Sequence, residues 1–206
     1  PQAFDEDMHI ENVGGTVAMI ERAKDLKEEK SQSFSASADM YHRFGAFQTN
    51  LLIEGFYTRL TDVFVLGEPY DRGDGILVKT RSNGPGAKVM GLTLEGKVAY
   101  LSILQIQAGL TLQRSRYDEP HKWHDDAPAE KKIFRTPDTY GYFTATCTPI
   151  KPLSIALSGT YTGRMLVQRM DITAENAELG EMPERKAEAI RTPRFFDLGV
   201  KLAYDF

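Results

Sequence analysis

The last eleven residues constrain the fold more than any other part of the chain, because apolar and small or charged side chains alternate along them. A β-strand points successive side chains to opposite faces. One face of the predicted strand is apolar and ends on aromatic residues: Phe196, Leu198, Val200, Leu202, Tyr204 and Phe206. The other face carries Asp197, Gly199, Lys201, Ala203 and Asp205. Such a strand fits a wall between lipid and an aqueous lumen.

Composition points to an all-β protein. Tyr, Phe, Thr, Ser and Gly are frequent in the 206 residues, and Pro clusters between the alternating runs. Hydrophobic residues make up 41% of the chain and the mean hydropathy is −0.37. The sequence contains no run near the roughly 20 apolar residues of a membrane-spanning helix. A membrane β-strand offers only every second side chain to lipid, which dilutes its hydropathy signal. Periodicity therefore decides the class.

Alternation recurs through most of the chain and predicts about seven strands after residue 32, plus a short hairpin arm. The runs cover residues 34–41, 47–58, 92–100, 104–113, 140–147, 153–162 and 196–206. Short reversals are predicted at 44–46, 101–103 and 149–152. In the run 140–147 both faces are mixed, and its orientation stays open. Residues 16–30 alternate poorly and favour a loop or a short surface helix.

Three longer polar stretches separate the other runs: Glu68–Asn83, Asp118–Lys132 and Asp171–Arg191. We predict that all three are loops on the same, extracellular side, because short turns on one side and long loops on the other are characteristic of outer-membrane barrels. Tyrosines near strand ends would anchor such a barrel at the two membrane interfaces. Residues 1–32 are predicted as a loop that leads into the barrel strands, and residues 33–206 as barrel strands and loops of one domain.

Few residues suggest chemistry. The segment His121–Asp126 brings two imidazoles and two carboxylates into one loop, but no thiolates accompany them, so we predict no metal site. Ligand-contact candidates are Tyr70, Arg116, Tyr117, His121, Trp123 and His124. No nucleophile set or phosphate-binding loop occurs, so no enzyme activity and no cofactor are expected. Cys147 is the only cysteine and is expected to be an inert strand residue.

The net charge of −4 and the scattered basic residues argue against a nucleic-acid partner. A more specific signal comes from residues 1–7 (PQAFDED), 25–31 (DLKEEKS) and 192–206, which ends on Tyr-Asp-Phe. These stretches resemble the C-terminal part of a TonB-dependent outer-membrane receptor of the Bacteroidetes type. Glu28 and Lys30 depart slightly from the family's phrase in the second stretch. The resemblance covers nearly the whole chain, but its motifs are structural.

The resemblance implies a location in the cell outer membrane and an antiparallel barrel of twenty-two strands around an N-terminal plug. Such receptors import a scarce nutrient: an iron chelate, haem, cobalamin or a glycan. The implied partners are outer-membrane lipid, the barrel-assembly machinery, the TonB energy-coupling complex acting through an N-terminal part, and a surface lipoprotein. The chain would supply the last third of the wall, and its terminal strand, Phe196 to Phe206, would be the barrel-assembly signal.

Two alternatives stay open at the level of sequence. One is a small, complete outer-membrane barrel with a structural or adhesive role. The other is a soluble lipocalin-like barrel, in which the apolar residues would face an internal ligand. Alternation alone does not separate inward from outward. The neutral polar groups opposite the apolar positions, such as Gln48, Gln105 and Ser158, favour the membrane, because a soluble exterior would carry more Lys and Glu.

Overall fold

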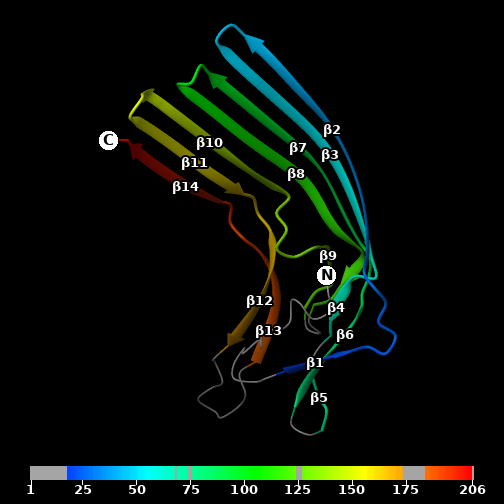
Figure 1. Ribbon diagram of the computed structural model, residues 1–206. Helices are drawn as coiled ribbons and strands as arrows, with labels where there is room; N and C mark the ends of the chain where they lie inside the picture. The colour runs from blue at the N-terminus through cyan, green and yellow to red at the C-terminus, as the bar shows by residue number, and fades with distance from the viewer. Residues whose placement is uncertain (1–17, 68, 74–75, 124–126, 174–183, 206) are drawn as a thin grey trace.

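The computed structural model describes residues 18–67, 69–73, 76–123, 127–173 and 184–205, and its main element is one antiparallel sheet. The strand order is β14-β11-β10-β8-β7-β3-β2, and the short β9 pairs with β8 (Figure 1). The strands are β2 (Lys30–Phe44), β3 (Phe47–Thr61), β7 (Ala87–Tyr100), β8 (Leu104–His121), β9 (Glu130–Lys132), β10 (Thr139–Ile150), β11 (Leu153–Thr162) and β14 (Phe195–Tyr204). The predicted all-β antiparallel fold is confirmed.

Tight turns join neighbouring strands at one end of this sheet. Gly45, with a φ of 57°, lies between β2 and β3, and Leu101, with a φ of 49°, lies between β7 and β8. Lys151 and Pro152 connect β10 to β11. All three reversals were predicted from the sequence: those at 44–46 and 149–152 because Gly and Pro are strong local signals for turns, and that at 101–103 because the alternation is interrupted there.

The strand register places the apolar side chains of all seven long strands on one face. Leu94, for example, lies opposite Ile53 of β3 and Leu110 of β8. We call this the apolar face; its larger members are Phe34, Met40, Leu51, Ile53, Tyr57, Met90, Leu92, Leu94, Val98, Ile106, Leu110, Leu112, Phe143, Ile155, Leu157, Tyr161, Phe196, Leu198, Val200, Leu202 and Tyr204. Polar side chains occupy the opposite, polar face.

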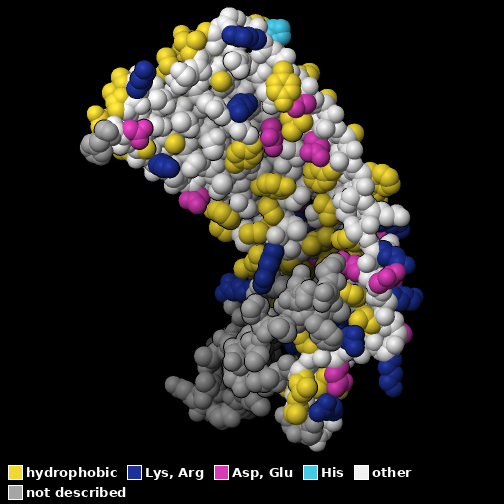
Figure 2. All heavy atoms as spheres, viewed as in Figure 1, with side chains coloured by type: hydrophobic (Ala, Val, Ile, Leu, Met, Phe, Trp, Pro, Cys, Tyr) yellow, Lys and Arg dark blue, Asp and Glu magenta, His cyan; other side chains and the backbone are white. Residues whose placement is uncertain are grey.

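The sheet is curved, and the apolar face is its outer side. Leu110 and Leu112 are 42% and 47% exposed, whereas Thr111, between them on the polar face, is 6% exposed. Figure 2 looks onto the polar face, where Lys, Asp and Glu side chains lie scattered among uncharged atoms. Hydrogen bonds link this face across strands, from Gln107 Nε2 to Tyr142 Oη (2.9 Å) and between the hydroxyls of Thr93 and Thr111 (3.0 Å).

The register also orients β10, which the sequence left open. Phe143 lies opposite Ala108 of β8 and Gly159 of β11, both on the apolar face, while Tyr142 and Thr144 lie on the polar face. The ring of Phe143 covers Gly159, where an added Cβ would collide with it. Phe143 also stacks on Phe196 of β14, with ring centroids 6.0 Å apart. Aromatic rings covering cross-strand glycines add packing where the glycine has no side chain.

A second, smaller sheet continues β3 and β7 beyond the main sheet. It consists of β1 (Ala18–Arg22), β4 (Phe64–Leu66), β5 (Tyr70–Asp71) and β6 (Leu77–Asn83). β1 pairs with β6 in parallel, from Ala18↔Leu77 to Arg22↔Arg81. The predicted loop or short helix at 16–30 is therefore wrong for residues 18–22, and β2 begins at Lys30 rather than residue 33. The pairing is long-range, so local periodicity carries no sign of it.

Asn83 links this small sheet to the main one. Its side-chain amide donates hydrogen bonds to the carbonyl oxygens of Lys27 (2.9 Å) and Asp62 (2.8 Å), and its Oδ1 accepts one from the Lys27 amide (2.7 Å). Asp62 has a φ of 54° and lies at the bend between β3 and β4. One side chain therefore fixes both the bend and the segment that leads into β2.

The described parts of the three predicted loops lie at the end of the sheet opposite the tight turns (Figure 1). Parts of them are strand: β5 and β6 fall within 68–83, where the sequence predicted a short hairpin arm, and β9 falls within 118–132. The last three residues of β12 (Leu166–Thr173) and all of β13 (Glu184–Arg191), which pair with each other, fall within 171–191. These strands lie beyond the apolar face, so their side chains are mostly polar. That polar composition is why the sequence suggested loops. No helix in the described residues could cross a bilayer.

Candidate functional site

Some of the residues that were predicted to contact a ligand lie where β8 extends beyond its apolar positions. Tyr117 and His121 lie on this extension of β8, with ring centroids 5.6 Å apart. Trp123 meets Phe134 edge to face at 6.3 Å. The alternation of β8 explains the first pair, because residues an even number apart share a face. Phe134 was not among the predicted residues. It lies beyond the 118–132 stretch, and the sequence gives no sign that it meets Trp123.

The other candidates lie elsewhere. Arg116 precedes Tyr117 on β8 and lies opposite Lys88 on the side of the apolar face, but it also contributes to the lining of the cavity described below. Tyr70 belongs to β5, pairs with Val78 of β6, and is 47% exposed. His124 lies outside the described residues, so the structure gives no position for it.

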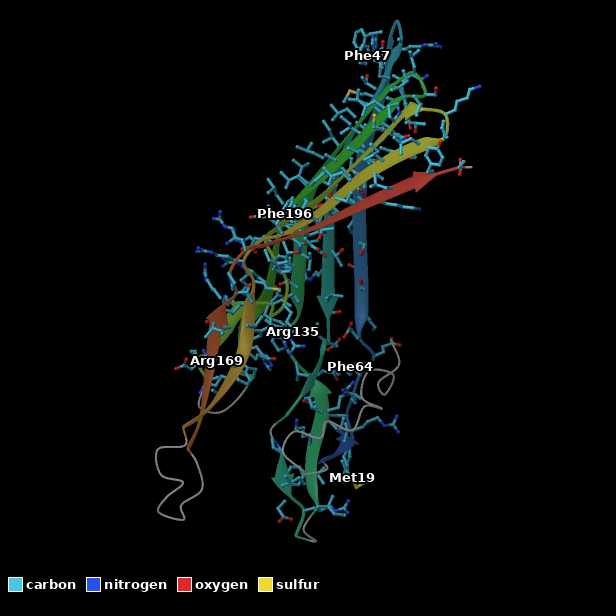
Figure 3. All side chains as sticks on the ribbon, turned by 90° about the vertical axis from the view of Figure 1, so that its left-hand side faces the viewer. Met19, Phe47, Phe64, Arg135, Arg169 and Phe196 are labelled. Carbon is cyan, nitrogen blue, oxygen red and sulfur yellow. The ribbon has the colours of Figure 1, made fainter. Side chains whose placement is uncertain are left out.

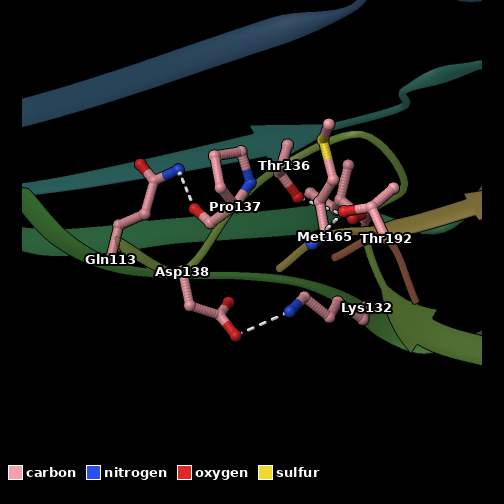
Figure 4. A network of polar contacts seen from close by, with 8 residues as sticks. Gln113, Lys132, Thr136, Pro137, Asp138, Met165 and Thr192 are labelled. Carbon is pink, nitrogen blue, oxygen red and sulfur yellow. Dashed lines mark hydrogen bonds and ion pairs between the residues drawn. The ribbon is translucent and has the colours of Figure 1, made fainter. Parts of the chain in front are cut away.

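A polar network joins this region to the β12–β13 hairpin (Figure 4). Gln113 Nε2 donates to the carbonyl oxygen of Pro137 (2.9 Å), and Lys132 Nζ pairs with Asp138 Oδ2 at 2.6 Å. Met165 and Thr192 flank the β12–β13 hairpin, and the Oγ1 of Thr192 accepts a hydrogen bond from the Met165 amide (3.2 Å). The segment from Lys132 to Asp138 is held against β8 by the bond to Pro137, and against the hairpin by a bond from the Arg135 amide to the carbonyl oxygen of Leu166 (2.7 Å).

A cavity of about 260 Å³ lies beside this network. Its lining consists of Gln113, Arg114, Ser115 and Arg116 of β8, together with Lys132, Asp138 and Arg191. The network fixes its walls through backbone carbonyls, which no residue pattern in the sequence specifies. The described residues therefore form a half-open recess, lined by polar and charged groups, at this end of the sheet.

Basic side chains border the apolar face at the same end. Lys88 lies opposite Arg59 on β3 and Arg116 on β8. Lys88 Nζ contacts Asp118 Oδ1 at 2.6 Å, and this hydrogen bond holds the pKa of the Asp118 carboxyl below its usual value. Sequence reasoning selected Arg116 alone, although the signal was present: the alternating runs of β3, β7 and β8 all change from apolar to basic at this level.

No metal centre is defined by the described residues, in which no group of three His, Cys, Asp or Glu side chains converges. His124, Asp125 and Asp126 of the predicted cluster fall outside those residues. Cys147 is half-buried on the apolar face near the tight turns.

We expect acidification to loosen the end of β8. Burial lowers the pKa of His121 below its ordinary 6.5, although Glu130 lies opposite it on β9. The folded state thus disfavours the imidazolium, and the stability of this end, complete above pH 6.5, is lost as the pH falls through the lowered pKa. Trp123 fluorescence should change between pH 7 and 5. The change should disappear in His121→Gln; an equal change in that variant would assign the transition to another group.

The fold, the two faces and the recess define a section of the wall of an antiparallel membrane-type β-barrel. Solved structures that resemble it include transporters and an import receptor. The FrpB iron transporter from Neisseria meningitidis (F3-3 variant) matches with a TM-score of 0.55 at 15% identity, over 93% of this chain and 26% of that one. The ferric-catecholate import receptor Fiu from E. coli K12 matches with a TM-score of 0.56 at 15% identity, over 89% and 22%.

The copper transporter OprC matches with a TM-score of 0.54 at 13% identity, over 88% of this chain and 24% of that one. The chain therefore spans about a quarter of the length of these structures. At such identities the likeness concerns the fold. No protein-family model matches the sequence, and no curated protein matches it significantly.

Proposed function

We propose that this chain forms part of the barrel wall of a TonB-dependent outer-membrane receptor that imports a scarce nutrient. The observation that carries the proposal is the separation of the two faces of the sheet, with apolar residues on the outer side and polar residues on the inner side. On β8 the apolar positions run from Leu104 to Leu112, which matches the roughly 9–11 residues of a membrane β-strand. Arg114 and Arg116 follow directly.

Aromatic residues at the borders of the apolar band support a membrane location. Near the tight turns Phe47 contacts Tyr100, with ring centroids 4.7 Å apart. At the far border Tyr57 lies opposite Phe34, and Tyr161 lies opposite Phe196. Figure 3 shows Phe47 at the end of the sheet with the tight turns and Phe196 closer to the small strands. Aromatic girdles at both interfaces are typical of outer-membrane barrels.

The shape of the sheet favours a large barrel over the two alternatives. A lipocalin-like barrel would turn its apolar side inward, whereas here the apolar face is the exposed outer one. A small closed barrel would pair its terminal strands, whereas among the described strands β2 pairs only with β3 and β14 only with β11. Open edges are costly in lipid, so further strands must cover both. We assign those strands, and a plug, to other parts of the receptor.

In this proposal the recess beside Gln113 and the rings of Tyr117, His121 and Trp123 face the cargo. An iron chelate, haem, cobalamin or a glycan would suit a site of aromatic and polar groups. Tyr70 of β5 is proposed to contribute from the same extracellular side, and His124, which lies outside the described residues, is proposed as a further contact. The barrel-assembly machinery would recognise the apolar positions of the terminal strand, and the TonB complex would act through the plug. A surface lipoprotein would cover the loops.

The mass of the protein isolated from an outer-membrane fraction tests this proposal, when combined with its migration in a detergent gel before and after boiling. A species several times heavier than 23.1 kDa that shifts on boiling is expected for the wall of a large receptor. A species near 23.1 kDa that shifts would instead indicate a small complete barrel. A protein found only in the soluble fraction would contradict the membrane location.

Single cysteines test the orientation of the sheet. In a Cys147→Ala background, Glu119→Cys on the β8 extension should react with a membrane-impermeant maleimide on intact cells, because the end of the sheet opposite the tight turns is proposed to be extracellular. Ser102→Cys, in the turn between β7 and β8, should react only after the outer membrane is opened. The reverse pattern would place the tight turns outside. Protein carrying Cys147→Ala alone gives the background labelling.

A further inference from the structure

Basic side chains form a row across three neighbouring strands at the outer border of the apolar face. Arg59 of β3 lies opposite Lys88 of β7, and Lys88 lies opposite Arg116 of β8. Arg114 lies two residues before Arg116 and shares its face. Arg59, Arg114 and Arg116 are exposed. The sheet register, rather than proximity in sequence, brings these cations together.

The row begins where the apolar positions end. On each of the three strands a basic residue is next to the last apolar residue of the same face. The pairs are Tyr57 and Arg59 on β3, Met90 and Lys88 on β7, and Leu112 and Arg114 on β8. A lipid that contacts the apolar residues with its acyl chains would therefore bring its headgroup to the level of these basic side chains. Arginine and lysine side chains at such a border can reach the interface while their stems stay on apolar surface.

A cavity of about 300 Å³ lies within the row. Its lining consists of Lys88, Met90, Arg114, Arg116, Tyr117, Asp118 and Lys131, so cationic groups surround an apolar floor that includes Met90. Asp118 is the acidic group in this lining; its carboxylate contacts Lys88, and its backbone carbonyl accepts a hydrogen bond from Lys131 Nζ (3.3 Å). The cluster keeps a positive balance, with Arg114 and Arg116 exposed beside the cavity.

We infer that this cluster, the basic rim (Arg59, Lys88, Arg114, Arg116 and Lys131), is a binding site for the phosphate group of an anionic membrane lipid. The inference rests on the proposed membrane location of the apolar face. Guanidinium groups bind phosphate through two parallel hydrogen bonds, which explains the use of arginine at the exposed positions. The lipid's acyl chains would lie along the column of Met90, Leu92 and Leu94, which continues directly from the cavity floor.

Native mass spectrometry of the full-length receptor tests the site. Wild-type protein, the double variant Arg59→Gln/Lys131→Gln, whose two residues do not line the recess beside Gln113, and the control Lys97→Gln are each titrated with dimyristoyl phosphatidylglycerol or dimyristoyl phosphatidylcholine. Lys97 lies on the same strand as Lys88 but on the polar face. Each basic group near a membrane surface adds about 1 kcal/mol, so the double variant should bind phosphatidylglycerol about 30-fold more weakly. Lys97→Gln should bind it as the wild type does.

Equal retention of phosphatidylglycerol by the double variant and the wild type would overturn the inference, as would equal retention of the two lipids by the wild type. Displacement of phosphatidylglycerol by millimolar inorganic phosphate would also overturn it, because the site would then serve a free anion. Heat-dependent gel migration and cargo uptake are measured on the same variants. If the double variant loses lipid selectivity but keeps heat-dependent migration and cargo uptake, the lipid site is distinct from the proposed function. If the wild type shows neither heat-dependent migration nor cargo uptake, the proposed function itself is contradicted.

Discussion

Leu94→Arg should lower the free energy of unfolding by about 2–4 kcal/mol in a lipid bilayer, because it places a charge in the middle of the apolar face. Leu94 is 39% exposed and lies between Ile53 and Leu110 on the adjacent strands. No acidic side chain lies on the neighbouring apolar positions to pair with the new guanidinium. The measurement is urea unfolding of the full-length protein in vesicles, followed by gel migration without boiling.

Glu95→Arg is the matched control, since it introduces the same side chain one residue along β7 on the polar face. Its free energy of unfolding should change by less than about 1 kcal/mol, because a lumen-facing arginine stays in water. Similar losses in the two variants would mean that β7 does not separate lipid from water, and the proposed orientation of the sheet would be wrong.

Gly91→Val should lower the free energy of unfolding by about 2–3 kcal/mol, near the upper range for overpacking. A Cβ at Gly91 would lie 2.5 Å from Cζ of Phe56 and 2.6 Å from the carbonyl oxygen of Leu112. The Phe56 ring could rotate away, but the carbonyl belongs to the paired strand β8 and cannot move without breaking the register. The same unfolding measurement checks this expectation.

Gly96→Val on the same strand provides the contrast. No atom lies within 4 Å of a Cβ at Gly96, and the position belongs to the apolar face. Valine there should be neutral or stabilise the protein by up to about 1 kcal/mol, because it removes the entropic cost of glycine in a strand. If Gly96→Val were as destabilising as Gly91→Val, a general intolerance of β-branching on β7 would replace the proposed steric cause.

Sequence reasoning was less effective for the candidate site than for the sheet. The alternation of β8 predicts that Tyr117 and His121 share a face, and the structure places their rings together. The recess beside Gln113 depends instead on the carbonyl oxygen of Pro137 and on the contact between Met165 and Thr192. Backbone carbonyl and amide groups are the same in almost every residue, so a pattern of side chains does not predict such contacts.

Local signals by themselves determined the strands that alternate clearly and the turns between them. The terminal strand and β11 could be predicted because each side chain's face follows from the two-residue period, and the turn at Gly45 because few residues adopt a positive φ. Only the tertiary structure decided the orientation of β10, the parallel pairing of β1 with β6, and the basic row through Lys88. These features arise from hydrogen bonds between segments far apart in the chain. The register of those bonds is set by the whole sheet, whereas periodicity describes one segment at a time.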